Sequence, residues 1–131
     1  MNVTQNEKAV RFLALHNGPG IFVIPNPWDV GSALILTGVG FQALATSSGA
    51  CAAAIGRRDG GLTRDEALEY ARLIVDATDL PVSADLENGF GDSPEVVAET
   101  IRLAAAVGLV GQHGPGFGPA QDRRPEPADP A

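Results

Sequence analysis

Hydrophobic positions fall into blocks along the chain, and up to about residue 110 these blocks predict strands alternating with helices. Residues 6–16 carry apolar side chains three and four positions apart, which predicts a helix with Ala9, Val10, Phe12 and Leu13 on one face. The blocks that follow repeat the order of strand, loop and helix, the pattern of an α/β fold.

Residues 21–24 are continuously apolar, as expected for a strand that is buried on both faces. Asn26 and Pro27 then favour the start of a helix, with asparagine as the N-cap and proline in the first helical position. We expect this helix to end at Gly38 or Gly40, because glycine commonly follows the last helical residue.

A second strand is predicted over residues 41–46, and a long loop of small residues follows it over 47–61. Thr63 and Glu66 have the spacing of a capping box, in which each side chain satisfies a free backbone amide of the other. The apolar stripe over residues 67–75 predicts that the next helix packs one face on the core.

A third strand is predicted over residues 81–85 and a fourth beginning at 108–110, with a helix opened by residues 93–94 between them. Repeated strand–helix units with buried strands imply a parallel sheet with right-handed crossovers. Two architectures fit this order, a (β/α)₈ barrel and a doubly wound sheet. A whole barrel needs about 250 residues, so the chain offers about half of one.

The pattern ends at residue 111. Residues 111–131 hold five of the ten prolines and show no apolar period of either kind. Two interpretations are open: a disordered tail, or a stretch translated out of frame from the point where the fourth strand begins.

Composition narrows the classes of protein further. The chain has 131 residues, 44% hydrophobic and 19% charged, which suits one domain. Its net charge of −7 disfavours nucleic acid and anionic membrane surfaces, both of which attract basic proteins. The single cysteine excludes an internal disulfide, and no apolar run approaches the roughly 20 residues of a membrane helix, so we expect a cytoplasmic protein without membrane spans.

The best-defined candidate site is the segment 85–91, Asp-Leu-Glu-Asn-Gly-Phe-Gly, at the end of the third predicted strand. Parallel α/β folds bind their ligands at this end of the strands. Asp85 and Glu87 are two residues apart, and both carboxylates can project to one side and bind Mg²⁺. Alternatively, they are loop carboxylates favoured by the N-terminus of the following helix.

Two further segments could contribute. Residues 46–50 (Thr-Ser-Ser-Gly-Ala) follow the second strand and could bind a carboxylate or an enolate oxygen, or form a plain turn. In the glycine-flanked loop 56–61, Asp59 could hold metal-bound water, or the loop could simply be solvated. Asp29 either lines the same face or serves the first turn of its helix. Cys51, among alanines, is expected to be a packed side chain.

Taken together, four ordered segments resemble the isocitrate lyase/phosphoenolpyruvate mutase superfamily, especially its phosphoenolpyruvate mutase-like branch. The matching segments cover most of residues 8–110 and are 22–33 (FVIPNPWDVGSA), 43–49 (ALATSSG), 56–60 (GRRDG) and 80–92 (LPVSADLENGFGD). The resemblance implies a (β/α)₈ barrel, an oligomer, and Mg²⁺-dependent lyase or mutase chemistry on small 2-oxo or enol acids through an enolate-type intermediate.

The resemblance also implies roles for single residues. Asp85 is expected to be the principal metal ligand, with Glu87 as a second acidic residue acting through metal-bound water. Asp59 resembles the acid that holds another such water, so Asp59 and Asp85 are the expected catalytic residues. The expected substrate-binding residues are Ser47, Ser48 and Gly49.

The chain departs from the family pattern at residues 111–114, where members carry an acidic Glu-Asp motif that completes the metal shell. Cys51 does not match the catalytic cysteine of the lyases. We therefore expect a partial barrel over residues 1–110 with a Gly/Pro-rich tail over 111–131, weakly active or inactive by itself.

Two other functions remain open. A half barrel exposes the edges of its first and fourth strands and one flank of its core, so it could be a non-catalytic module that pairs with itself or with a full-length relative. A small doubly wound domain of the flavodoxin or response-regulator type also fits the length, but it needs further strands after residue 111.

Overall fold

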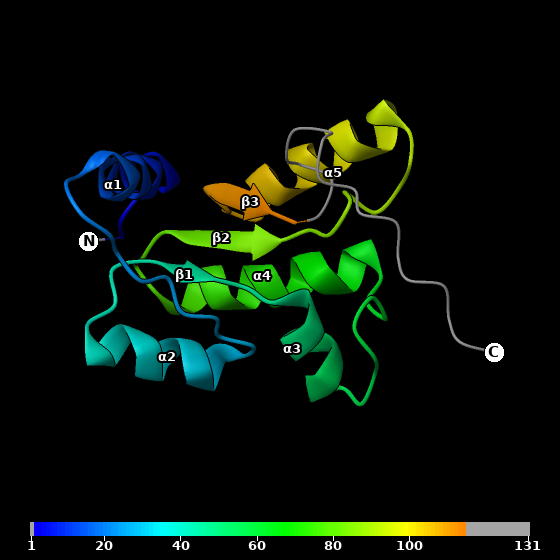
Figure 1. The fold of residues 1–131 in the computed structure, drawn as a ribbon, viewed down its shortest axis with the longest axis horizontal. Helices are drawn as coiled ribbons and strands as arrows, with labels where there is room; N and C mark the ends of the chain where they lie inside the picture. Colours follow the sequence, from blue (N-terminus) through cyan, green and yellow to red (C-terminus); the bar gives the residue numbers. More distant parts are fainter. Residues whose placement is uncertain (1, 115–131) are drawn as a thin grey trace.

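The computed structural model describes residues 2–114, which form five helices and three strands (Figure 1). In chain order the elements are α1 (Gln5–Asn17), α2 (Val30–Val39), β1 (Leu44–Ala45), α3 (Ser48–Ala54), α4 (Arg64–Ala77), β2 (Val82–Asp85), α5 (Pro94–Ala106) and β3 (Gly111–His113). The tail expected over 111–131 lies, beyond Gly114, outside the described residues.

The strands form one parallel sheet in the sequential order β1-β2-β3, with Leu44 opposite Val82 and Ser83 opposite Gly111. Helices α2, α4 and α5 all pack against the same face of this sheet. A doubly wound sheet carries its crossover helices on both faces. Sequential strand order with the crossover helices on one face is instead the arrangement of a barrel wall, and it disagrees with a flavodoxin-like or response-regulator-like fold.

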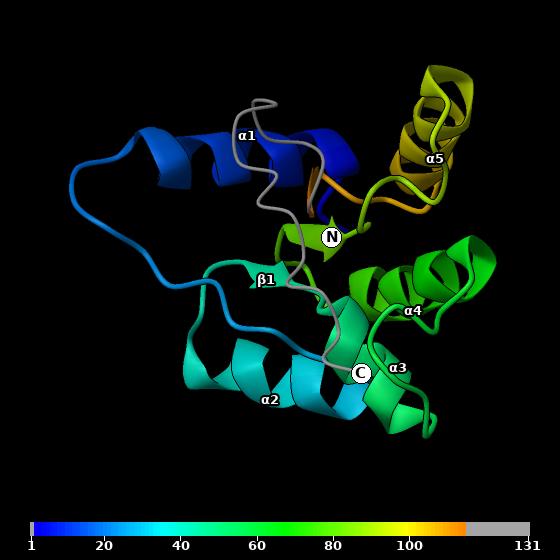
Figure 2. The ribbon, with the colours of Figure 1, turned by 45° about the vertical axis from the view of Figure 1, so that its right-hand side comes forward.

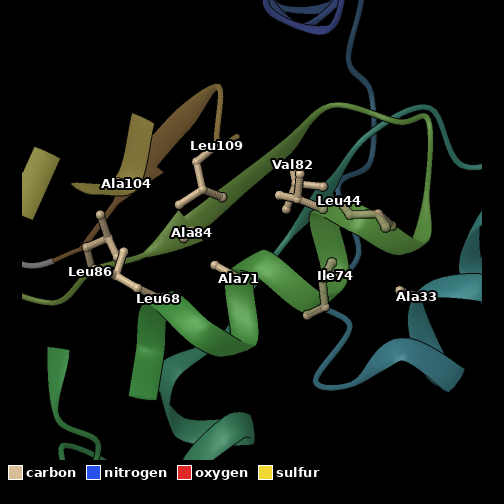
Figure 3. Packing of buried hydrophobic residues seen from close by; sticks show 11 residues of the cluster. Ala33, Leu44, Leu68, Ala71, Ile74, Val82, Ala84, Leu86, Ala104 and Leu109 are labelled. Atoms are coloured by element: carbon tan, nitrogen blue, oxygen red, sulfur yellow. The ribbon is translucent and has the colours of Figure 1, made fainter. Parts of the chain in front are cut away.

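The core lies between the sheet and these helices (Figure 3). Along β2 the side chains alternate, so Val82 and Ala84 join the core while Ser83 and Asp85 point to the other face. Ile74 and Ala71 of α4 meet the strands and are fully buried. This alternation gives the second face of β2 a polar character, with Ser83 buried there, and places a carboxylate at the end of the strand.

The predicted capping box of α4 is confirmed, since Thr63 is the N-cap and Glu66 returns the bond to its backbone. The predicted start of α2 is wrong, because Asp29 and not Asn26 is the N-cap. Asp29 Oδ1 accepts from the Ser32 amide at 2.7 Å, the second of the two roles considered for this residue. Asn26 instead donates its side-chain amide to the carbonyl of Ala45 at 2.9 Å, which ties the extended segment to β1.

Residues 21–24 do not form the expected strand buried on both faces. Ile21 is 96% exposed and Val23 is 64% exposed, and the segment is irregular. Its neighbour Pro25 accepts one backbone bond from Ala45, but residues 21–24 have no ladder with β1. An apolar run is a strand only where partner backbone lies alongside it, and in the described residues this one has none.

The other strand predictions are confirmed with shifted boundaries. The second predicted strand shortens to the two residues of β1. The last one begins at Gly111, three residues later than expected, because Gly108 adopts a left-handed conformation (φ 95°) after α5. Val110 then donates its backbone amide to Val82 and begins the pairing with β2.

Helix α1 reaches the rest of the chain through polar side chains and through the ring of Phe12, which lies against Gly111 of β3. Its predicted apolar face is only partly confirmed: Ala9 and Phe12 are half-buried, whereas Val10 and Leu13 are each 62% exposed, and Lys8 is its buried residue. The ammonium of Lys8 donates to the carbonyl of Thr78 at 2.8 Å, and the Gln5 amide donates to Leu109. Helix α1 therefore lies at the N-terminal ends of the strands, on the side of the sheet away from α4 and α5 (Figure 2).

Within residues 2–114, no helix combines the length and the hydrophobicity that crossing a bilayer requires.

We predict that Gln112→Leu increases the free energy of unfolding by about 1 kcal/mol. The side-chain oxygen of Gln112 is buried without a hydrogen-bond partner in the described structure, and a buried acceptor of this kind costs about 1–3 kcal/mol. Urea denaturation would measure the change, with Gln42→Leu at an exposed position as the matched control. A lower midpoint for Gln112→Leu than for the unmodified chain would contradict the prediction.

Candidate functional site

Acidic and hydroxyl side chains meet where β1 and β2 end. Asp85 is the last residue of β2, and Thr46, Ser47 and Ser48 directly follow β1. Because the two strands are parallel neighbours, these residues share one edge of the sheet. This is the edge at which barrel enzymes place their catalytic groups.

The carboxylate of Asp85 is held by hydrogen bonds from two segments. Asp85 Oδ2 accepts from Ser48 Oγ at 2.6 Å and from the Ser48 amide at 3.2 Å, and Oδ1 accepts from the Glu87 amide at 3.0 Å. Thr46 Oγ1 accepts from the amide of Asp85 at 3.1 Å. Both the backbone amide and the carboxylate of Asp85 are therefore held by hydrogen bonds, and the carboxylate has one orientation.

Asp59 reaches the same place from the loop between α3 and α4. A Cβ placed on Gly49 would lie 3.4 Å from the carboxyl carbon of Asp59, so this side chain packs directly on the Gly49 backbone. Ser48 Oγ lies 3.5 Å from Asp59 Oδ1. The predicted site residues Asp59 and Asp85 are thus brought together on either side of Ser48.

Glu87 completes the group from the loop after β2. Its backbone is left-handed (φ 51°), an uncommon conformation for a residue with a side chain. Burial raises the pKa of the Glu87 carboxyl, and the negative charges of Asp85 and Asp59 raise it further. Glu87 therefore lies close enough to Asp85 and Asp59 to be repelled by both carboxylates.

These carboxylates suit a cation that keeps much of its hydration. Within residues 2–114, no group of three acidic, histidine or cysteine side chains is arranged to hold a metal ion. Mg²⁺ instead binds through one or two carboxylates and several waters. An oriented Asp85 with Glu87 and Asp59 nearby fits that mode, since their mutual repulsion would be relieved by positive charge.

Several polar groups of the predicted substrate-binding residues make hydrogen bonds within the protein. Ser47 is the N-cap of α3, and its hydroxyl accepts from the Ala50 amide at 3.2 Å. The hydroxyl and the amide of Ser48 both serve Asp85. Gly49 adjoins Asp59. All three predicted residues lie at the site, and their role toward a substrate stays a prediction.

Sequence reasoning missed the role of Thr46. Its hydroxyl orients the backbone of Asp85, and its position directly after a buried strand beside two serines was the available signal. Cys51 is 2% exposed, as expected of a packed residue, and burial raises the pKa of its thiol. Arg57 pairs with Glu66 at 2.6 Å and is thereby directed to α4.

Comparison with known proteins identifies a family to which this chain is similar. The family model for phosphoenolpyruvate phosphomutase matches residues 12–113. A 2-methylisocitrate lyase of Bacillus subtilis is 39% identical over 89 residues, 67% of this chain and 30% of that protein. A 2,3-dimethylmalate lyase of Eubacterium barkeri is 37% identical over 66% of this chain and 30% of its own length.

Solved structures show the same likeness. A Burkholderia cenocepacia protein described as a lyase/mutase superposes with a TM-score of 0.82 and 55% identity, covering 82% of this chain and 39% of that one. A phosphoenolpyruvate phosphomutase of Streptomyces platensis superposes with a TM-score of 0.75 at 28% identity, over 79% of this chain and 36% of its own. The chain thus spans about a third of the length of the curated relatives and up to two-fifths of these structures.

We predict that Glu87→Gln stabilises the metal-free protein at pH 7. A carboxyl whose pKa is raised in the folded state loses its proton more easily when unfolded, so stability falls as pH rises from about 4.5, the ordinary value, through the raised value. The stabilisation should therefore fade as pH falls from the raised value toward 4.5. Glutamine keeps the backbone strain unchanged, which isolates the charge.

Chemical denaturation between pH 4 and pH 8 would test this, with Glu69→Gln as the control of opposite sign. The hydrogen bond from Arg72 lowers the pKa of Glu69, so that substitution should destabilise the protein near neutral pH. Equal pH profiles for Glu87→Gln and the unmodified chain would refute the prediction.

Proposed function

Because the chain belongs to the phosphoenolpyruvate phosphomutase family of the isocitrate lyase/phosphoenolpyruvate mutase superfamily, we propose that its described residues carry the first part of a Mg²⁺-dependent active site. The reaction class would be the making or breaking of C–C or P–C bonds in small 2-oxo or enol carboxylic acids. The observation that carries this proposal is the group of three carboxylates, with Asp85 fixed by three donors, at the strand ends.

The charge of the site supports a cation. Small 2-oxo and phosphono acids are anions, and three carboxylates alone would repel them. Asp85 would bind Mg²⁺ directly, with Glu87 and Asp59 holding metal-bound waters. The ion, when bound, would offset most of the negative charge of the site and would act as a Lewis acid toward the enolate oxygen that develops as the bond breaks.

This chain's own residues would orient the reactants. Ser48 and Thr46 hold Asp85 in one position, so little reorganisation would be needed when a ligand binds. Gly49 would let the substrate approach the backbone closely, beside Asp59. Ser47, Ser48 and Gly49 form the edge where the substrate's carboxylate would lie.

We further propose that this chain by itself turns over such acids weakly or not at all, and that it works in the cytoplasm. The described residues provide three strands, and the matched stretch covers only 30% of the length of these two relatives. Steady-state assays with oxaloacetate, phosphonopyruvate and 2-methylisocitrate would test this. Turnover that is abolished by Asp85→Ala would refute the proposed inactivity while supporting the proposed site.

A second candidate function is supported by the exposed apolar surface. Large apolar side chains on α2 and on the segment before it are 53–96% exposed: Ile21, Val23, Leu34, Ile35 and Val39. Such exposure on a one-sided sheet favours a half barrel that pairs with itself or with a longer relative. Sedimentation equilibrium would distinguish the two functions, because a mass that rises with concentration in the absence of Mg²⁺ binding favours the module.

We predict that Mg²⁺ stabilises the unmodified protein and that Asp85→Asn abolishes this gain. A ligand at ten times its dissociation constant adds about 1.4 kcal/mol to the stability of the state that binds it. Thermal unfolding with and without 10 mM Mg²⁺ measures the gain. Asp79→Asn, an exposed acid before β2, is the matched control and should keep the gain. An unmodified protein that Mg²⁺ does not stabilise would count against the metal site.

A further inference from the structure

We propose that Thr100 is a positioning residue for the carboxylates at the site, because its hydroxyl fixes the loop that carries Glu87. This inference rests on the proposed cation-binding function. Thr100 lies in α5, does not reach the site itself, and would act through Gly89. Its effect would be on the affinity of the site for a divalent cation.

Thr100 is the fully buried hydroxyl of the described structure. Its side chain is 0% exposed, and Oγ1 lies 2.8 Å from the carbonyl of Gly89 and 3.0 Å from that of Val96. A threonine within a helix commonly bonds the carbonyl four residues earlier, which here is Val96. The shorter contact is the one to Gly89, which joins α5 to the loop over residues 86–92.

This loop holds a conformation that its residues do not favour. Glu87 (φ 51°), Gly89 (φ 85°) and Phe90 (φ 61°) are all left-handed, and the two that carry side chains each cost about 1–2 kcal/mol. The other hydrogen bonds of these residues are local, from Glu87 to Asp85, from Gly89 to Leu86 and from Phe90 to Asn88. Local bonds do not fix the loop relative to α5.

Packing on α5 leaves the loop little freedom of position. A Cβ placed on Gly89 would lie 2.9 Å from the Val97 side chain, and one on Gly91 would collide with Val96. The glycines thus let the loop lie directly on α5, where the Thr100 hydroxyl meets the Gly89 carbonyl. The contact also gives a buried backbone acceptor its partner.

Glu87 lies between two fixed points. On one side Asp85 is held by Ser48, and on the other Gly89 is held by Thr100. Without the hydroxyl, the Gly89 carbonyl would be buried and unpaired, and the strained residues could relax and move Glu87 away from Asp85. A bound cation would then have to restore the loop, and its affinity would fall.

The test compares Thr100→Val, which keeps the shape and removes the donor, with Thr100→Ser, which keeps the donor. Mn²⁺ serves as the probe, titrated by electron paramagnetic resonance at a temperature where circular dichroism shows every variant folded. We expect Thr100→Val to lower Mn²⁺ affinity about tenfold and to speed amide hydrogen exchange over residues 86–92. Thr100→Ser should stay within about twofold of the unmodified chain.

The matched control is Thr37→Val in α2. Thr37 Oγ1 has the same type of helix bond, 2.8 Å from Ala33, and it also contacts Thr78 at the opposite end of the strands. This variant should lose stability without losing Mn²⁺ affinity. If valine is not tolerated at position 100, Thr100→Ala removes the same donor without placing a methyl group against the carbonyl, and the same criteria apply.

Unchanged affinity and exchange in a folded Thr100→Val protein would overturn the proposal. Equal losses of affinity in Thr100→Val and Thr37→Val would also overturn it, since they would reflect stability alone. Absence of Mn²⁺ binding to the unmodified chain would instead refute the proposed cation site, which distinguishes the two failures.

Discussion

The contact between Ser48 and the carboxylate of Asp85 joins two segments 37 residues apart, and the candidate site depends on it. It forms because β1 and β2 are parallel and adjacent, so that the residues after one strand meet the last residue of the other. Asp59 then packs against Gly49, and Glu87 donates its amide to Asp85. Parallel pairing of two short strands therefore assembles a group of acids that lies scattered along the sequence.

Acids placed together in this way have an energetic cost. Burial and mutual repulsion raise the pKa of Glu87, and its backbone and that of Phe90 are left-handed. Features of this kind persist only where the surrounding structure holds them in place. Here Leu86 is fully buried in the core, and α5 supports the rest of the loop. The core is thus part of what keeps the acids together.

Features set by neighbouring residues could be predicted from the sequence. The capping box of Thr63 and Glu66 is recognised by their spacing of three residues. The position of Asp85 at the end of a strand is recognised by the buried strand that precedes it. Residues 21–24 could not be assigned correctly, because the same apolar run is a strand or an exposed segment depending on what lies beside it. The role of Lys8, and the left-handed backbone of Glu87, likewise depend on distant parts of the chain.

The burial of Cys51 has a practical consequence. It is the single cysteine of the chain, it lies in α3 three residues after Ser48, and its thiol is shielded from solvent. A thiol-reactive dye can therefore modify it only when the packing around α3 opens, and the rate of labelling reports how often that happens. The labelling rate of this native cysteine thus measures local opening next to the acidic residues, and no cysteine has to be introduced for the experiment.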